Sequence, residues 1–262
     1  MMVPSSECRP TQRFSDRVTY YVRARPGYPA QLIEFFVADL GVAPVHRIVD
    51  VGSGTGLLSE LFLRNGNQVI GLEPNTEMRE AGEEFLRKYP NFQSVNATAE
   101  ATTLPDRAAD FVVAGQSFHW FDRVKARSEF GRISSPGCRI VLVWNERLMS
   151  ASRFDAGYDR LIREFAVESH VDRHVTLTHS PDAALGPFFG PDHFKIRRFD
   201  NFQELNLDDL KARLLSSSYM PLPGYPMFLP MIARAEDLFA AHAVGGRVRI
   251  SYDTRAYYGT IS

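Results

Sequence analysis

The sequence contains few cysteines and no long apolar run. Its two cysteines, Cys8 and Cys138, lie far apart and match no metal-binding or redox spacing. This scarcity favours a reducing compartment, with the cytoplasm as the default. No segment approaches the roughly 20 apolar residues of a membrane-spanning helix, and the first residues lack the apolar core of a signal peptide. We therefore expect a cytoplasmic protein with no membrane partner.

The chain also lacks an excess of charge of either sign. Its 30 Lys and Arg residues nearly balance its 31 Asp and Glu residues, whereas proteins that bind nucleic acid usually carry a basic excess. Nucleic acid is therefore not an expected partner. His170, His174 and His179 lie close together in the sequence, but no cysteine and no His-Glu-x-x-His helix accompanies them. No metal site is predicted.

The most informative segment is residues 48–56, which predicts a buried strand that runs into a glycine-rich turn. Residues 48–51 are mainly β-branched, which suits a parallel strand covered on both faces. Gly52, Gly54 and Gly56 then let the backbone turn sharply and approach a ligand closely. Apolar residues at helical spacing follow the turn. Strand, glycine turn and helix form the opening unit of a nucleotide-binding α/β sheet.

The spacing of the glycines narrows the class of ligand. The dinucleotide fingerprint is G-x-G-x-x-G, whereas this chain has Gly52-x-Gly54-x-Gly56 and no glycine one place later. The next strand, residues 68–72, ends in Glu73, where a carboxylate can accept hydrogen bonds from both hydroxyls of a ribose. An NAD-dependent oxidoreductase shares this topology and stays an alternative, although the glycine spacing disfavours it.

Two stretches, Asp50-Val51-Gly52-Ser53-Gly54-Thr55-Gly56 and Gly71-Leu72-Glu73-Pro74, resemble those of class I S-adenosylmethionine (SAM) methyltransferases. SAM has a ribose and an adenine but no phosphate, so a phosphate-binding third glycine is not needed. The resemblance implies SAM as the cofactor. It also implies cofactor contacts, which are Asp50, Gly52, Ser53, Gly54, Gly56, Glu73 and Pro74, and, flanking the adenine after the third strand, Thr98, Ala99 and Glu100.

The segment that follows the fourth strand carries further candidates at the same edge of the sheet. Gln116 is placed to bond the methionine part of SAM. The stretch His119-Trp120-Phe121-Asp122 resembles the small-molecule branch of methyltransferase type 11, which includes trans-aconitate methyltransferase-like proteins. His119 is the candidate catalytic base and, with Trp120 and Tyr219, a candidate substrate contact. The competing interpretation is that the aromatic residues belong to the core and that His119 caps a helix.

An arm before the first helix is dense in tyrosine and arginine. Its order Tyr-x-x-x-Arg-Pro-x-Tyr-Pro, at residues 21–29, is similar to the arm that closes over SAM in that branch. Arg25 can pair with the methionine carboxylate, and Tyr21 can cover the sulfonium. The alternative is a basic, solvated segment.

The order of the elements predicts an α/β fold, a doubly wound, seven-stranded, mostly parallel sheet of the Rossmann-like methyltransferase type with a helical substrate-cavity insertion. Strands are expected at 48–51, 68–72, 92–96, 110–115 and 139–144, with an antiparallel closing strand. Helices are expected at 31–40, 154–165, 207–215 and 228–244, and 169–192 is expected to be irregular. Two further helices are expected to begin at the caps Asn75 and Asp122, the second with Val124, Phe130 and Ile133 facing inward. The domains predicted are an N-terminal arm (1–30), a SAM-binding core (31–149), substrate-cavity insertions (150–192 and 208–246) and closing strands (193–207 and 247–262).

Methyl transfer from SAM to a small molecule, to a carboxylate or a hydroxyl, is the function that the resemblance implies. A SAM-binding protein without catalysis stays open as an alternative. A nucleic-acid methyltransferase is disfavoured by the balanced charge and by the absence of an Asn/Asp-Pro-Pro-aromatic motif. The sequence leaves the oligomeric state open.

Overall fold

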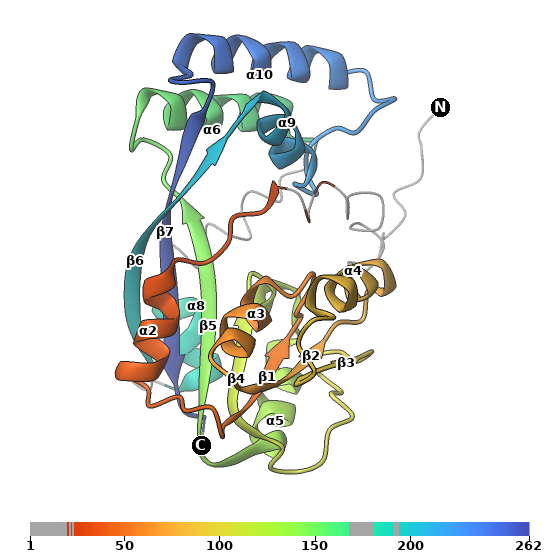
Figure 1. The fold of residues 1–262 in the computed structure, drawn as a ribbon, viewed down its shortest axis with the longest axis vertical. Coiled ribbons are helices and arrows are strands. Elements are labelled where there is room, and N and C mark those ends of the chain that lie inside the picture. The colour runs from red at the N-terminus through yellow and green to blue at the C-terminus, as the bar shows by residue number, and fades with distance from the viewer. Residues whose placement is uncertain (1–19, 21, 23, 168–180, 191–193, 262) are drawn as a thin grey trace.

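The computed structural model describes residues 20, 22, 24–167, 181–190 and 194–261. Within them, seven strands form one sheet in the order β3-β2-β1-β4-β5-β7-β6 (Figure 1). The strands are β1 (Arg47–Val51), β2 (Gln68–Leu72), β3 (Phe92–Val95), β4 (Ala109–Gly115), β5 (Ser134–Arg147), β6 (Phe194–Leu205) and β7 (Val248–Gly259). The first five are parallel, and β7 runs antiparallel between β5 and β6. The predicted fold class is confirmed.

Helices cover both faces of the sheet, as the alternation of side chains along its buried strands requires. Ile48, Phe111 and Val141 pack on one face with α2 (Ala30–Ala38) and α3 (Leu57–Arg64). Their neighbours Val49 and Val112 face the other side, with α5 (Arg123–Ile133) and α8 (Pro181–Phe189). The order in which the chain adds strands to the sheet reverses between β1 and β4, which is where open α/β sheets bind ligands.

Two helix N-termini follow the side-chain capping that the sequence predicts. The helix α4 (Thr76–Leu86) begins at Asn75, whose side-chain oxygen accepts from the Met78 N–H at 2.8 Å. Asp122 caps α5 in the same way, accepting from the Lys125 N–H. Both caps fix where a helix starts just after a strand end, and so they fix the loops that border the binding edge.

Two local predictions were wrong. Residues 169–192 were expected to be irregular, yet α8 lies within them, with Phe188 and Phe189 buried against the core. Val124 was expected to face inward but is 82% exposed. The buried stripe of α5 is Ala126, Phe130 and Ile133, and Val124 falls outside that helical spacing.

Three strands extend past the core and carry a group of helices, here called the cap. It comprises α6 (Arg153–Phe165), α9 (Leu207–Leu215) and α10 (Phe228–His242). In Figure 1 the cap lies at the top, on the far ends of β5, β6 and β7. The cap has its own apolar cluster, in which α6 and α9 pack on Val248, Ile250 and Tyr252 of β7. The predicted domain boundaries stay predictions.

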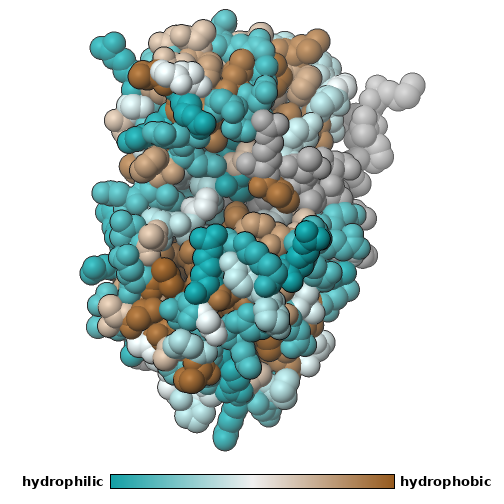
Figure 2. Space-filling model, in the orientation of Figure 1, coloured by the Kyte–Doolittle hydropathy of each residue, from teal (hydrophilic) through white to brown (hydrophobic). Residues whose placement is uncertain are grey.

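Hydrophilic and hydrophobic residues are interspersed over both halves of the face in Figure 2. Among the described residues, no helix combines the length and apolarity required to span a bilayer.

Candidate functional site

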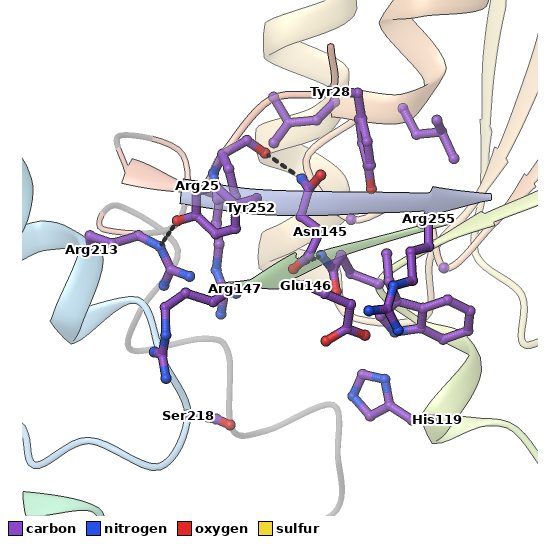
Figure 3. Close-up of a pocket in the computed structure, with 18 of the residues that line it drawn as sticks. Arg25, Tyr28, His119, Asn145, Glu146, Arg147, Arg213, Ser218, Tyr252 and Arg255 are labelled. Carbon is purple, nitrogen blue, oxygen red and sulfur yellow. Dashed lines mark hydrogen bonds between the residues drawn. The ribbon is translucent and has the colours of Figure 1, made fainter. Parts of the chain in front are cut away.

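A cavity of about 260 Å³ lies between the carboxyl edge of the sheet and the cap. Its floor is the glycine turn after β1 together with the ends of β4 and β5. The cap closes the other side with side chains from α6 and α9, and Arg25, Pro26 and Tyr28 of the arm also line the cavity. Figure 3 shows Arg213, Arg147 and Tyr252 at one end of the cavity and His119 with Glu146 at the other.

The glycine turn has a backbone that only glycine adopts readily. Gly52, Gly54 and Gly56 have φ of 69°, 55° and 85°, in the left-handed region. A Cβ on Gly52 would lie 2.6 Å from the Cβ of Ser117, whose hydroxyl donates to the Val51 carbonyl. The first two glycines line the cavity. The turn therefore presents bare backbone to whatever occupies the cavity.

Glu73 ties the glycine turn to the end of β2. Its Oε2 accepts from the Gly54 N–H at 3.0 Å, and its Oε1 accepts from the Asn75 N–H at 2.8 Å. The side chain is 8% exposed, and burial raises the pKa of its carboxyl despite these two hydrogen bonds. A carboxylate has about four acceptor sites, so two remain for the hydroxyls of a ribose.

Asp50 lies at the bottom of the cavity and is fully buried. Its Oδ2 accepts from the Ser59 hydroxyl at 2.7 Å. Its Oδ1 has no hydrogen-bond partner among the described residues. Burial raises the pKa of Asp50 to about 7, and the charge of Glu73 adds to the rise. A buried acceptor without a partner, beside a bare glycine turn, suits a ligand with a cationic donor such as the α-ammonium of SAM.

The segment after β4 brings Gln116, His119 and Trp120 to the cavity wall, as predicted from their position in the sequence. Gln116 has φ of 58°, a strained conformation for a residue with a side chain, and its Nε2 donates to the Asn145 carbonyl at 3.4 Å. His119 and Trp120 belong to a short 3-10 helix, with ring centroids 4.7 Å apart. Phe118 of the same helix is core, which was the competing interpretation for the aromatic residues.

The arm is fastened across the cavity by hydrogen bonds. Arg25 Nη2 donates to the Ser216 carbonyl of the cap at 2.9 Å, and Gln203 donates to the Ala24 carbonyl at 3.0 Å. Asn145 and Asn201 both donate to the Gly27 carbonyl. Arg25 and Tyr219 line the cavity, so both lie where a ligand can reach them. Tyr21, the other arm residue proposed for SAM, lies outside the described residues.

Glu73 and several other predicted cofactor contacts are not among the residues that line the cavity. Thr98 is exposed, Ala99 is buried, and Glu100 accepts from the Asp122 N–H at the start of α5. Pro74 follows Glu73, and Gly56 caps α3 against Leu86, where a Cβ would lie 2.5 Å from the leucine side chain. Their roles in cofactor binding stay predictions.

The cap end of the cavity is lined by residues that the sequence did not single out. They are Arg147 of β5, Asp159 and Arg163 of α6, and Arg213 of α9, beside Tyr252 of β7; Glu146 of β5 and Arg255 of β7 line the side of the cavity nearer His119 (Figure 3). No local motif marks them, because they come from four elements that meet only in the folded chain. The polar end of β5 after an apolar run is the one signal that points to them.

No metal site is formed by the part of the chain that the structure describes: no group of three His, Cys, Asp or Glu residues there could hold an ion. The three histidines of 170–179 lie outside that part.

Comparison with known proteins agrees with this geometry. Residues 49–142 match the family model described as a methyltransferase domain. An uncharacterised methyltransferase of Mycobacterium tuberculosis is 34% identical over 134 residues, which are 51% of this chain and 52% of that protein. An uncharacterised methyltransferase of Schizosaccharomyces pombe is 30% identical over 135 residues, 51% of this chain and 53% of that protein. The chain thus spans about half the length of the curated relatives that it matches.

Solved structures extend the likeness of the fold beyond that half. A protein provisionally described as a type II methyltransferase from Anaeromyxobacter dehalogenans superposes with a TM-score of 0.67, covering 90% of this chain and 97% of that one at 23% identity. A provisionally assigned methyltransferase from Anabaena variabilis gives 0.57, covering 91% and 99% at 18% identity. The cap and the core therefore recur together in other folds of this kind.

Proposed function

We propose that the chain is a class I SAM-dependent methyltransferase, a proposal supported by the methyltransferase-domain match of residues 49–142, and that it transfers the methyl group of SAM to a small-molecule acceptor held between core and cap. The observation that carries this proposal is the continuity of one cavity from the glycine turn to the cap. The turn offers the cofactor bare backbone, and the cap offers the acceptor a set of polar side chains. The trans-aconitate methyltransferase-like subtype stays an expectation.

The residues of the cofactor end fit SAM by their chemistry. The unpartnered Asp50 oxygen is an acceptor for an ammonium group, and Glu73 keeps acceptor sites for a ribose. Arg25 lines the cavity, and its guanidinium can pair with the carboxylate of SAM. When bound, SAM supplies an electrophilic methyl group on a sulfonium. The chain then has to align the acceptor and exclude water, for which the fastened arm is suited.

The need for a base depends on the acceptor. A carboxylate attacks the methyl carbon without losing a proton, so it needs alignment alone. A hydroxyl or an amine has to release a proton, and His119, which lines the cavity, is our candidate for the base that takes it.

Two measurements test the function. Calorimetric titration with S-adenosylhomocysteine (SAH) and, separately, with NAD should show binding of SAH alone; binding of NAD alone would favour the oxidoreductase alternative. Incubation with methyl-labelled SAM and a panel of small hydroxyl, amine and carboxylate compounds should transfer label to at least one class. SAH binding without transfer to any class would favour a SAM-binding protein that does not catalyse.

A further inference from the structure

Arg213 of α9 is a buried cation that forms no ion pair with a carboxylate in the described part of the chain. It is 7% exposed, and within the described residues its guanidinium donates to hydroxyl oxygens, those of Tyr252 at 3.3 Å, Ser217 at 3.2 Å and Ser216 at 3.4 Å. Among the described residues, no acidic side chain forms an ion pair with it. A buried charge is normally paired, because desolvation costs far more than hydroxyl contacts return. Arginine cannot avoid the cost by losing its proton.

Arg147 joins Arg213 at the same end of the cavity. It is the last residue of β5 and lies directly opposite Tyr252 of β7, so the two side chains share one face of the sheet. Tyr252 is also the residue that accepts from Arg213, which links the three. Arg147 Nη2 pairs with Asp159 at 2.8 Å, but its buried Nε has no partner among the described residues. Arg147 therefore also keeps unused donor capacity.

The charges at this end do not balance. Asp159 is shared, because it accepts from Arg147 through one oxygen and from Arg163 through the other, both at 2.8 Å. Among the described residues that line the cap end, the guanidinium groups of Arg147, Arg163 and Arg213 thus face one carboxylate, that of Asp159. Glu146, another acidic residue of the lining, lies at the opposite end beside His119 (Figure 3).

The pKa of Tyr219 indicates a positive electrostatic potential at the cap end of the cavity. Burial alone would raise the pKa of its hydroxyl, but the nearby charges of Arg147 and Arg213 lower the pKa below its usual value. The positive charges at the cap end therefore favour the binding of a negatively charged group.

We infer that the methyl acceptor carries an anionic oxygen group, a carboxylate or a phosphate, which Arg147 and Arg213 bind at the cap end of the cavity. This inference rests on the proposed methyl transfer. Both groups suit the planar donor fork of arginine, which bonds two oxygens at once. Anchoring the group there directs the rest of the acceptor along the cavity toward the glycine turn. The group that receives the methyl is then selected by its distance from the anchor.

The test uses the full chain saturated with SAH and four small probes in two matched pairs. Benzoate is compared with benzamide, and phenyl phosphate with phenol, by calorimetric titration. We expect each anion that fits to bind at least tenfold more tightly than its neutral partner, and the better of the two anions identifies the anchored group as carboxylate or phosphate. Equal affinity within both pairs would overturn the inference.

Three variants locate the binding. Arg147→Gln and Arg213→Gln should each weaken binding of the preferred anion at least tenfold while leaving SAH affinity within twofold. Arg160→Gln, on the exposed side of α6, is the matched control and should change neither. Because Arg213 is buried, unfolding of Arg213→Gln is checked by its urea midpoint, and Arg213→Lys, which keeps the charge, replaces it if necessary.

The outcomes separate this inference from the proposed function. Retention of anion binding in both the Arg147 and the Arg213 variants would overturn the inference, as would a loss of SAH affinity with anion binding unchanged, since the arginines would then serve the cofactor. Failure of the wild-type protein to bind SAH contradicts the proposed function instead. The probe titrations are therefore repeated without SAH, where the same anion preference is expected.

Discussion

Asp50→Asn should remove a pH dependence from the stability of the protein. The carboxyl is fully buried, has one hydroxyl donor in Ser59 and leaves its other oxygen without a partner in the described structure. Burial raises the pKa of Asp50 from 3.8 to about 7, and the negative charge of Glu73 contributes. The native protein therefore keeps a proton on Asp50 at pH values where the unfolded chain has lost it. Asparagine has a similar shape and does not titrate in this range.

The sign and the size follow from linkage. Between pH 4 and pH 7 the native state binds more protons at Asp50 than the unfolded state, so the free energy of unfolding falls as pH rises. The contribution is fully present below the unfolded pKa and is lost as pH rises through the folded pKa. A shift from 3.8 to about 7 corresponds to roughly 4 kcal/mol over the whole window, at about 1.4 kcal/mol per pKa unit.

Urea unfolding of wild type and Asp50→Asn at pH 5, 6, 7 and 8 measures this effect. Other carboxyls titrate too, and Asp110, whose pKa is lowered by its hydrogen bonds with Arg47, acts in the opposite direction. They cancel in the difference between the two proteins. That difference should change by roughly 2–3 kcal/mol in favour of the variant between pH 5 and pH 7 and then level off. A difference that stays constant from pH 5 to pH 8 would refute the argument, because Asp50 would then be ionised throughout.

Ligand binding gives a second readout of the same group. If the α-ammonium of SAH lies against Asp50, only the ionised carboxylate binds it well. The affinity of the wild type for SAH should then rise roughly tenfold between pH 6 and pH 8, in proportion to the ionised fraction. The affinity of Asp50→Asn should not follow pH in this way.

The core of the fold could be predicted because its signals are local. β1 and β2 are apolar runs bounded by turn residues, and the structure places them within one residue of the predicted bounds. Each is buried between helices, so its composition reflects its surroundings. The glycine turn could also be predicted from the sequence, because a positive φ at alternate residues favours glycine, and three glycines occur there at that spacing.

Elements fixed by distant contacts were harder to predict. β5 continues to Arg147, although its apolar run ends at Trp144. Its last three residues are polar because they line the cavity, so the apolar pattern stops before the strand does. The helix α8 contains Pro187, and its sequence has little local preference for helix. Packing against the core stabilises it instead, with the ring centroids of Phe188 and Phe118 4.7 Å apart. Tertiary packing overrides local preference in such places.

The candidate site likewise has one end that could be predicted from the sequence and one that could not. The cofactor end is encoded in consecutive residues after β1 and β4, which is why Asp50, Gly54 and His119 could be named from the sequence. The acceptor end depends on a pairing between β5 and β7 and on the packing of α9 against them. Arg147 and Arg213 lie far apart in the chain, and only the antiparallel register brings Tyr252 between them.

Three further variants test the cofactor end and the chemistry. Glu73→Ala should weaken SAH binding by about 2–4 kcal/mol, since charge-assisted hydrogen bonds are worth about 1.5–3 kcal/mol each. Glu77→Ala, at an exposed position of α4, is the control. Equal affinities of the two variants for SAH would contradict the ribose assignment. Gly54→Val should abolish SAH binding in a folded protein, whereas Gly137→Val, which also has positive φ but nothing within 4 Å of its Cβ, should cost stability alone. We expect His119→Ala to leave SAH affinity within twofold, because the role proposed for this cavity-wall imidazole is to take a proton from the acceptor and not to hold the cofactor. If the acceptor is a hydroxyl or an amine, the loss of its base should lower kcat by about 100-fold or more, with a matching loss in kcat/KM. If the acceptor attacks through a carboxylate, the loss should be less than about fivefold, since no proton has to leave. The size of the loss in kcat therefore identifies the class of nucleophile, and a His119→Ala protein that unfolds or no longer binds SAH would show that the histidine is a core or cofactor residue instead.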